Sequence, residues 1–323
     1  MTTRRTLTSL EICAGGGGQA LGLEMSGFQH LGLVENDRHA CATLRRNRPN
    51  WKVFEKDVRA FVLHDAEVFR DKVDLLAGGV PCPPFSVAGR QLGRDDERDL
   101  FPVALQLVEI LKPRAVMLEN VRGLLQLRFD EYRAEIDRAL RKLGYASGWR
   151  LLQASDFGVP QLRPRVVCVA IESRLASSDP WNTLSLASSQ RPAPTVGECL
   201  VHMMSAAGWK GAAAWAGGAN LIAPTLVGGS KKHGGADLGP TRAKRACAEL
   251  GVDGGGLADA PPPKSFKGAP RLTLQMAAAL QGFPSDWVFV GGKTNAYRQV
   301  GNAFPPPVAA AVGAAIRAFL RRT

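Results

Sequence analysis

The sequence predicts an α/β protein, in which a doubly wound sheet is joined to a second, smaller and loop-rich domain. Three observations predict this class. Short apolar runs alternate with helical stretches over the first 170 residues, residues 176–270 are rich in Gly and Pro, and regular patterning returns after residue 270. Alternating strands and helices are typical of a parallel sheet that is covered by helices on both faces.

The strands and helices of the sheet domain follow from the local pattern. Apolar runs predict strands over 7–13, 31–35, 53–58, 73–77, 115–118 and 166–171. Apolar positions at helical spacing predict helices over 19–26, 37–47, 98–111 and 130–143. The chain ends in an alanine-rich segment that predicts a helix over 307–321.

The middle of the chain differs in composition. Residues 176–270 contain 15 Gly and 9 Pro among 95 residues, about one quarter. A disordered linker is the simpler alternative for such a segment. Trp181, Trp209 and Trp215, together with Leu, Ile and Val clusters, favour a modest core, so we predict a small folded domain here.

The overall composition suits a soluble globular protein with a substantial core. The chain has 323 residues, of which 45% are hydrophobic and 22% are charged. No apolar run approaches the length of a membrane span, and residues 1–5 lack a signal-peptide core. The six Cys include no C-x-x-C spacing and the five His show no metal-ligand spacing. We therefore expect no metal, no membrane and reduced thiols in a cytoplasm.

The positive charge is concentrated toward the carboxyl end. The net charge is +12, and residues 210–323 alone carry 14 Lys and Arg against 5 Asp and Glu. Such a segment favours a polyanionic partner, most simply nucleic acid, although a solubilising surface would have the same composition.

Cys82 lies in a stiff turn after an apolar strand. Residues 78–86 read Gly-Gly-Val-Pro-Cys-Pro-Pro-Phe-Ser. Proline fixes φ, so three prolines in four positions hold the thiol in one pose, as a nucleophile requires. A rigid loop with a bystander cysteine remains open from this segment alone.

A glycine-rich loop follows the first strand and precedes a helix. Gly15–Gly18 would let a ligand approach the backbone and the free amides of the helix. Glu35 follows 20 residues after Gly15, where an acid binds ribose hydroxyls in nucleotide-binding folds. The loop also satisfies a loose dinucleotide pattern, so a nicotinamide or flavin enzyme stays open at this point.

Two further segments add polar groups at strand ends. Glu119 follows the strand predicted over 115–118, so it faces the same crevice as Cys82. A thiolate and a desolvated carboxyl together suit nucleophilic attack with proton donation. Arg163 and Arg165, two residues apart on an extended segment, should point the same way and could bind a carbonyl or phosphate; a salt-bridged strand edge is the alternative.

Taken in order, these elements resemble the DNA (cytosine-5)-methyltransferase family of bacterial restriction–modification systems. The resemblance covers nearly all of the chain outside 176–270. Its motifs are Glu11-Ile12-Cys13-Ala14-Gly15-Gly16-Gly17-Gly18, Pro81-Cys82, Glu119-Asn120-Val121, Gln161-x-Arg163-x-Arg165, Arg271-Leu272-Thr273 with Leu280-Gln281-Gly282-Phe283-Pro284, and Arg298-Gln299-Val300-Gly301-Asn302-Ala303. Six motifs in order are a highly specific match.

The resemblance implies a Rossmann-like fold that binds S-adenosylmethionine and methylates a flipped-out cytosine. It implies that Cys82 attacks C6, that Glu119 holds and protonates N3, and that Arg165 binds O2, with Arg163 as a further catalytic residue. The cofactor residues that it implies are Cys13, Ala14, Gly15, Gly16, Gly17, Gly18, Glu35, Asn36, Asp57, Val58, Pro81, Leu100, Asn302 and Ala303.

The resemblance also implies a division of the chain and a set of DNA contacts. Residues 1–176 and 292–323 would form the catalytic domain, and 177–291 the target-recognition domain. The DNA-binding candidates are Ser86, Arg98, Lys231, Lys232, Arg242, Lys244 and Arg245. Basic residues of this kind can neutralise phosphates without reading sequence. We expect a cytoplasmic monomer that acts on double-stranded DNA, and a cognate restriction endonuclease acting separately is left open.

Two departures from the family pattern stand out. The aromatic residue of the cofactor loop is Cys13 here, and the common Pro-Cys-Gln is Pro-Cys-Pro83. Three other functions stay open: a tRNA cytosine-5 methyltransferase, although its Cys-Phe-Thr signature is absent from the sequence; a nicotinamide or flavin oxidoreductase; and a catalytically silent DNA-binding module, which intact Cys82, Glu119 and Arg165 disfavour.

Overall fold

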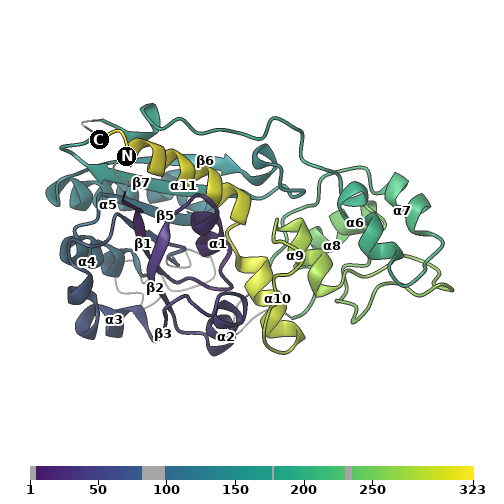
Figure 1. Ribbon diagram of the computed structural model, residues 1–323. Helices are drawn as coiled ribbons and strands as arrows, with labels where there is room; N and C mark the ends of the chain where they lie inside the picture. The colour runs from purple at the N-terminus through teal and green to yellow at the C-terminus, as the bar shows by residue number, and fades with distance from the viewer. Residues whose placement is uncertain (1–4, 82–98, 177, 230–234) are drawn as a thin grey trace.

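A mixed sheet flanked by helices forms the larger of two lobes (Figure 1). The computed structural model describes residues 5–81, 99–176, 178–229 and 235–323. Within these ranges seven strands pair in the order β3-β2-β1-β4-β5-β7-β6. They are β1 (Thr8–Ile12), β2 (Gln29–Glu35), β3 (Val53–Glu55), β4 (Leu75–Gly78), β5 (Ala115–Val121), β6 (Tyr145–Gln153) and β7 (Pro164–Glu172).

Helices cover both faces of the sheet, and further helices build the smaller lobe. The sheet is flanked by α1 (Gly18–Met25), α2 (Arg38–Asn47), α3 (Val58–His64), α4 (Phe101–Leu111), α5 (Asp130–Lys142) and α11 (Pro306–Leu320). The smaller lobe contains α6 (Val196–Ser205), α7 (Ala212–Gly218), α8 (Thr241–Glu249), α9 (Leu274–Leu280) and α10 (Lys293–Asn302) (Figure 1).

Two cores sandwich the sheet because successive side chains of a strand point to opposite faces. Leu76 of β4 and Val116 of β5 join the core beneath α3, α4 and α5. Their neighbours Leu75 and Ala115 join the core on the other face, beneath α1 and α11. The buried strands therefore read as continuous apolar runs, and the prediction of a Rossmann-like α/β sheet is confirmed.

The sheet differs from the expected parallel one at its edge. The pairs β1–β2, β1–β4, β2–β3 and β4–β5 are parallel, but β7 is antiparallel to both β5 and β6. Strand β6 carries the partly exposed Ser147, Arg150 and Gln153, so it lacks the apolar run that marks the inner strands. The expectation of an all-parallel sheet is wrong at this edge.

The strand order creates a switch point between β1 and β4. From β1 the chain moves outward to β2 and β3, whereas from β4 it moves the other way to β5. Ligands of doubly wound sheets bind outside the carboxyl ends of strands at such a point. The carboxyl end of β1 leads into Cys13–Gly18, and that of β4 leads through Gly79 to Pro81.

A third core holds the smaller lobe together and extends into α10. It joins Trp209 and Leu226 to Tyr297 and Val300. Helix α10 packs into this core, while α11 packs against α1. The assignment of residues 292–323 to the catalytic domain stays a prediction. The stretch Lys293–Leu320 is long and apolar enough to cross a membrane by composition, yet most of it is buried within the protein.

Helices α1 and α11 approach so closely that Gly22 has no room for a side chain. A Cβ there would meet the carbonyl oxygen of Pro306 and lie 2.5 Å from the Cβ of Ala309. Helix propensity alone favours Ala over Gly by about 1 kcal/mol. At Gly22 the steric clash outweighs this gain in helix propensity. We therefore predict that Gly22→Ala lowers the free energy of unfolding by about 1–3 kcal/mol, measured by urea denaturation.

Gly217 of α7 supplies the matched control for this prediction. A Cβ at Gly217 would meet nothing within 4 Å among the described residues. Gly217→Ala should therefore raise the free energy of unfolding by roughly 0.5–1 kcal/mol. Equal effects of the two substitutions would contradict close packing of α1 on α11.

Candidate active site

The loop after β1 turns on residues with positive φ. Cys13, Gly15 and Gly17 have φ of +53°, +53° and +88°, and the N–H of Gly17 donates to the carbonyl of Ala14 at 3.0 Å. A Cβ on Gly18 would meet the carbonyl oxygen of Phe304. The glycines therefore allow both the sharp turn and the close contact with the segment before α11.

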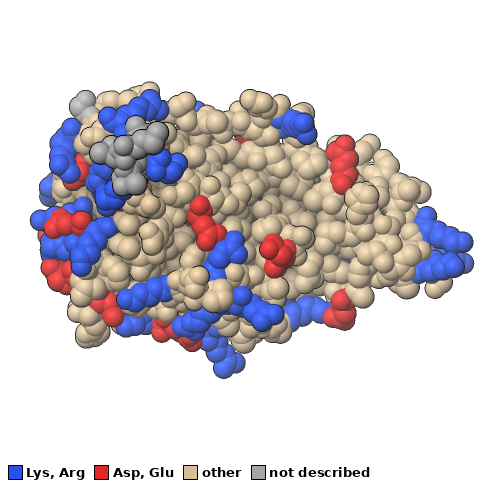
Figure 2. All heavy atoms as spheres, in the orientation of Figure 1, with Lys and Arg blue, Asp and Glu red and all other residues tan. Residues whose placement is uncertain are grey.

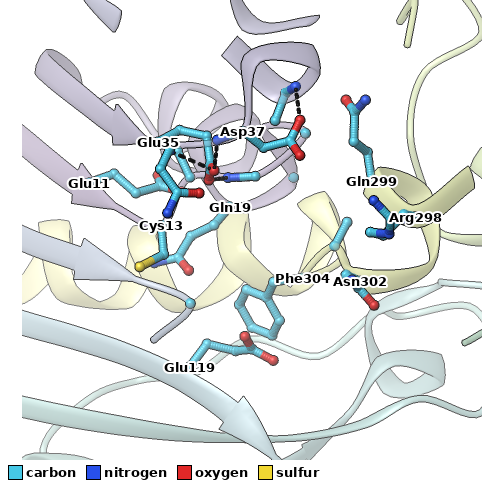
Figure 3. A pocket seen from close by; sticks show the side chains of 18 of the residues that line it. Glu11, Cys13, Gln19, Glu35, Asp37, Glu119, Arg298, Gln299, Asn302 and Phe304 are labelled. Carbon is cyan, nitrogen blue, oxygen red and sulfur yellow. Dashed lines mark hydrogen bonds between the residues drawn. The ribbon is translucent and has the colours of Figure 1, made fainter. Parts of the chain in front are cut away.

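The Glu35 carboxylate fixes the shape of this loop. Its Oε2 accepts the N–H of Gly15 at 2.7 Å, and its Oε1 accepts the N–H groups of Asn36 at 2.8 Å and Asp37 at 2.7 Å. The first bond joins the loop after β1 to the end of β2, and the other two hold the turn that leads into α2 (Figure 3). A carboxylate held in this way is preorganised for a ligand hydroxyl at the same edge of the sheet.

The switch point opens into a hollow of about 280 Å³, the main pocket (Figure 3). Expected site residues from four separate segments line it, which places the glycine loop, an acid and the last motif around one space. They are Cys13, Ala14, Gly15, Gly16, Gly18, Glu35, Asn36, Glu119, Asn302 and Ala303. Gly17 is not among them, because a Cβ there would point at Leu44 and Trp287, each at 2.8 Å.

An adjoining hollow of about 220 Å³, the side pocket, shares Cys13, Glu35 and Asn36 with the main pocket. Its other expected residues are Asp57, Val58, Pro81 and Leu100. Burial raises the pKa of the Cys13 thiol, with a further contribution from Glu35, so a neutral thiol stands where the two pockets meet. The two hollows adjoin at these shared residues and together provide space for an elongated ligand.

Glu119 and Arg165 form a buried ion pair at the carboxyl end of β5. Arg165 Nε lies 2.8 Å from Glu119 Oε1, and both side chains are about nine-tenths buried. Antiparallel pairing of β5 with β7 sets Val121 opposite Arg165 and so brings the two strand ends together. Burial raises the pKa of Glu119, while Arg165 and Arg163 pull it down. The carboxyl is therefore placed to hold or release a proton.

Asn120 ties this acid to the turn that precedes Cys82. Its Nδ2 donates to the carbonyl of Val80 at 2.8 Å, and its Oδ1 accepts the N–H of Val121 at 2.8 Å. The end of β5 thus fixes the backbone two residues before Cys82. Cys82 itself lies outside the described residues.

Arg163 does not lie where we expected it. It is fully buried and donates to the carbonyls of Leu226 at 2.8 Å, Gly301 at 2.7 Å and Ala303 at 2.9 Å. It precedes β7 and, among the described residues, bonds only to these carbonyls and to Gln161, whereas Arg165 lies within the strand and pairs with Glu119, which lines the main pocket. The alternation rule that aligned the two arginines holds only inside a strand, so we assign Arg163 a structural role.

Gln161 extends the same buried network. Its Oε1 accepts the N–H of Leu226 at 3.0 Å, and its Nε2 donates to Gln281 Oε1 at 2.9 Å. Gln281 in turn donates to the carbonyl of Val300 at 2.5 Å. This network bonds the start of β7 to α9, to α10 and to the segment around residue 226.

The candidates for DNA contact are only partly described. Arg242 and Arg245 are exposed on α8, and Lys244 lies 2.7 Å from Asp237 and is less free to meet a phosphate. Ser86, Arg98, Lys231 and Lys232 lie outside the described residues.

The main pocket also contains polar residues that we did not expect. Glu11 and Gln19 are 1% and 4% exposed, and their side-chain oxygens and nitrogen have no hydrogen-bond partner within the described part of the chain. Desolvation, followed by the charge of Glu35, raises the pKa of Glu11 well above its ordinary value. Asp37, Asn295, Arg298 and Gln299 complete this set, and Phe304 is an apolar residue of the same wall. Two sequence signals were available: Glu11 is a charged residue inside an apolar strand, and Glu11, Arg298 and Gln299 stand within two of the motifs given above.

Residues 7–318 match the family described as C-5 cytosine-specific DNA methylase. The chain is 58% identical over 320 residues to the Type II methyltransferase M.NaeI of Lentzea aerocolonigenes, covering 98% of this chain and 76% of the relative. It is 51% identical over 317 residues to the Type II methyltransferase M.NgoMIV of Neisseria gonorrhoeae, covering 98% of each.

Solved structures share the fold at low identity. The Dnmt2 methyltransferase of S. pombe has a TM-score of 0.65 at 16% identity, covering 98% of this chain and 99% of its own. An E. coli prophage protein titled as a DNA modification methyltransferase has a TM-score of 0.65 at 21% identity, covering 98% and 100%.

Glu11 should make stability depend on pH. Folding raises the pKa of Glu11, so the folded chain keeps the proton on Glu11 at pH values where the unfolded chain has lost it, above about 4.3. The free energy of unfolding therefore falls as the pH rises. We predict that Glu11→Gln is increasingly more stable than the wild type from pH 5 to pH 7, by up to about 1.4 kcal/mol per pH unit. Urea denaturation at both pH values measures this, and a constant difference would contradict it.

The two arginines should differ in their effect on stability. Arg163→Met leaves three backbone carbonyls without their donor, and we predict a loss of at least about 3 kcal/mol in the free energy of unfolding. Arg165→Met breaks one pair whose carboxyl can take up a proton, so its loss should be smaller. An equal or larger loss for Arg165→Met in urea denaturation would refute the structural role of Arg163.

Proposed function

The chain belongs to the C-5 cytosine-specific DNA methylases, and from this membership we propose that it methylates C5 of one cytosine within a specific duplex sequence. It is a DNA (cytosine-5)-methyltransferase with a Rossmann-like sheet. The observation that carries the proposal for its site is the buried Glu119–Arg165 pair, whose Glu119 lines the main pocket together with the glycine loop.

The two pockets fit S-adenosylmethionine as the methyl donor. Glu35 would take ribose hydroxyls, and Asp57 in the side pocket would take the adenine amino group. The two unpartnered oxygens of Glu11, counted among the described residues, would meet a cationic group of the ligand. When bound, the cofactor supplies an electrophilic methyl group on a sulfonium.

The chain's own residues would prepare the cytosine. The base must leave the duplex, because its C6 atom cannot be reached while it is stacked. Cys82 would add to C6 as a thiolate, while Glu119 gives a proton to N3 and Arg165 holds O2. C5 then becomes nucleophilic and takes the methyl group. Loss of the C5 proton and departure of the Cys82 thiolate restore the aromatic ring.

The raised pKa of Glu119 supports its role as the acid. An ordinary exposed glutamate would be ionised at neutral pH and could not donate. Burial raises the pKa of Glu119 and so favours its protonated form, whereas the positive charge of Arg165 lowers the pKa. A carboxyl with these opposing influences can give a proton to N3 and later recover one.

Double-stranded DNA is the proposed partner, with the smaller lobe as the target-recognition domain. Figure 2 shows Lys and Arg along the lower edge of the visible face and at the far end of the smaller lobe. Arg242 and Arg245 of α8 are described candidates for phosphate contact. We place residues 177–291 in this domain, with α10 packed onto its core.

The biological setting follows from the relatives. Both are named Type II methyltransferases, which supports a role in protecting host DNA from a cognate endonuclease that acts separately. A cytoplasmic monomer would suit that role. Similarity at 51–58% identity to Type II enzymes and the match to a DNA methylase family favour DNA over tRNA.

Methyl transfer to DNA tests the assigned residues. We predict that Cys82→Ser abolishes tritium transfer from S-adenosylmethionine to duplex DNA, and that Glu119→Gln lowers the rate about 10²–10⁴-fold, because it keeps the shape but supplies no acid. Bisulfite sequencing of DNA from expressing cells would report the methylated sequence.

Arg138, exposed on α5 and paired with Glu131, offers a control, and Arg138→Gln should retain the wild-type rate. Equal transfer of tritium by the wild type and by Cys82→Ser would contradict the assignment of Cys82 as the nucleophile. Preferential labelling of tRNA in a mixture with DNA would overturn the substrate.

A further inference from the structure

Gln19, in the first turn of α1, has a buried side-chain amide that forms no hydrogen bond with the described residues. The residue is 4% exposed, and neither Nε2 nor Oε1 has a hydrogen-bond partner in the ranges that the structure describes. Leaving a buried donor and a buried acceptor unpaired costs free energy, and most buried polar groups avoid it. A ligand that supplies both partners would remove this cost.

The position of Gln19 selects the part of the cofactor that it could meet. Gln19 lines the main pocket but not the side pocket, which holds Asp57 and Leu100. Figure 3 shows it on the same side as Glu11 and Cys13, across the pocket from Arg298 and Asn302. The side pocket suits the adenine, and Glu35 suits the ribose. The rest of the cofactor, its α-amino-acid end, falls within the main pocket.

The charges around the main pocket make a donor scarce. Glu11, Glu35, Asp37 and Glu119 all line it; an ionised carboxylate only accepts, and a protonated carboxyl donates a single O–H. Among its described lining side chains, the buried donors without a partner are Gln19 Nε2 and Arg298 Nε. Gln299 Nε2 and Asn302 Nδ2 already donate to the carbonyls of Val290 and Gly229.

Of these two donors, Gln19 matches the amino-acid end better. That end carries a carboxylate and an ammonium, so it offers both an acceptor and a donor. The amide of Gln19 needs both, whereas Arg298 has donors only, and its Nη1 already bonds Asn295 at 3.3 Å. Gln19 also sits in the first turn of an eight-residue helix, whose N-terminal end favours an anion.

We propose that Gln19 recognises the α-carboxylate of the cofactor's amino-acid end through Nε2, with Oε1 turned to the neighbouring ammonium. The inference rests on the proposed function, since it takes S-adenosylmethionine as the ligand. It adds a specificity-determining residue, which separates ligands that carry the amino-acid end from those that lack it.

The proposal predicts that one substitution raises the thermal stability of the free protein and weakens its binding of ligand. Gln19→Met keeps the length and helix propensity of the side chain but removes both unpaired polar atoms. Without ligand, this variant should melt at a higher temperature than the wild type, because the unpaired groups are gone. It should nevertheless bind the cofactor product more weakly.

Isothermal titration with two probes tests the binding. S-Adenosylhomocysteine carries the amino-acid end, and 5′-deoxy-5′-methylthioadenosine replaces it with a methyl group. We expect Gln19→Met to weaken binding of the first about 10- to 100-fold, as for loss of a hydrogen bond to a charged group, and to change the second by less than twofold. Gln153→Met on β6, outside both pockets, is the matched control and should change neither.

Three results would overturn the role of Gln19. Affinity for both probes could fall in parallel, which would indicate a general disturbance of the pocket. Affinity for S-adenosylhomocysteine could stay unchanged. Selective loss could appear in Arg298→Met instead, which would assign the carboxylate to Arg298. Failure of the wild type to bind S-adenosylhomocysteine would be distinct from these, because it would overturn the proposed cofactor itself.

Discussion

The buried guanidinium of Arg163 is the interaction on which the arrangement of the two lobes depends. It bonds backbone carbonyls at residues 226, 301 and 303, which come from the smaller lobe, from α10 and from the segment before α11. Desolvation lowers the pKa of Arg163 well below its usual value, so the cost of burial is real, and the hydrogen bonds to carbonyl oxygens offset it. Because residues 302 and 303 line the main pocket, the same bonds also set one wall of the site.

The site itself is a product of sheet topology. The connections that leave the neighbouring strands β1 and β4 run in opposite directions across the sheet, so the glycine loop and the segment before Cys82 reach one crevice from different parts of the chain. Strand β7 then enters in the opposite direction and brings Arg165 to Glu119. If β7 ran parallel to β5, its first residues would lie at the amino end of β5, away from Glu119.

Much of this arrangement could be predicted from sequence, and the rest depends on three-dimensional pairing. The strand around 115–118 and the glycine loop carry local patterns, so Glu119 and Glu35 could be placed at one edge of the sheet. The direction of β7 leaves no local pattern, and β6 is an edge strand with polar residues. Arg163 and Arg165 look alike in sequence, but only one lies inside a strand. Gln19 could not be singled out, because the lack of a partner becomes visible only once its neighbours are known.

Helix α10 joins the core of the smaller lobe, whereas α11 packs on α1, so the two cores part between residues 302 and 306. Asn302, Ala303 and Phe304 of this segment also line the main pocket. Any change in the angle between the lobes is therefore a change in the shape of the cofactor site. By thermodynamic reciprocity, a ligand that binds one pocket shape more tightly than another must shift the lobe angle by the same free energy. On the proposed function, DNA and the cofactor would then influence each other's affinity through the angle between the lobes, in addition to any direct contact.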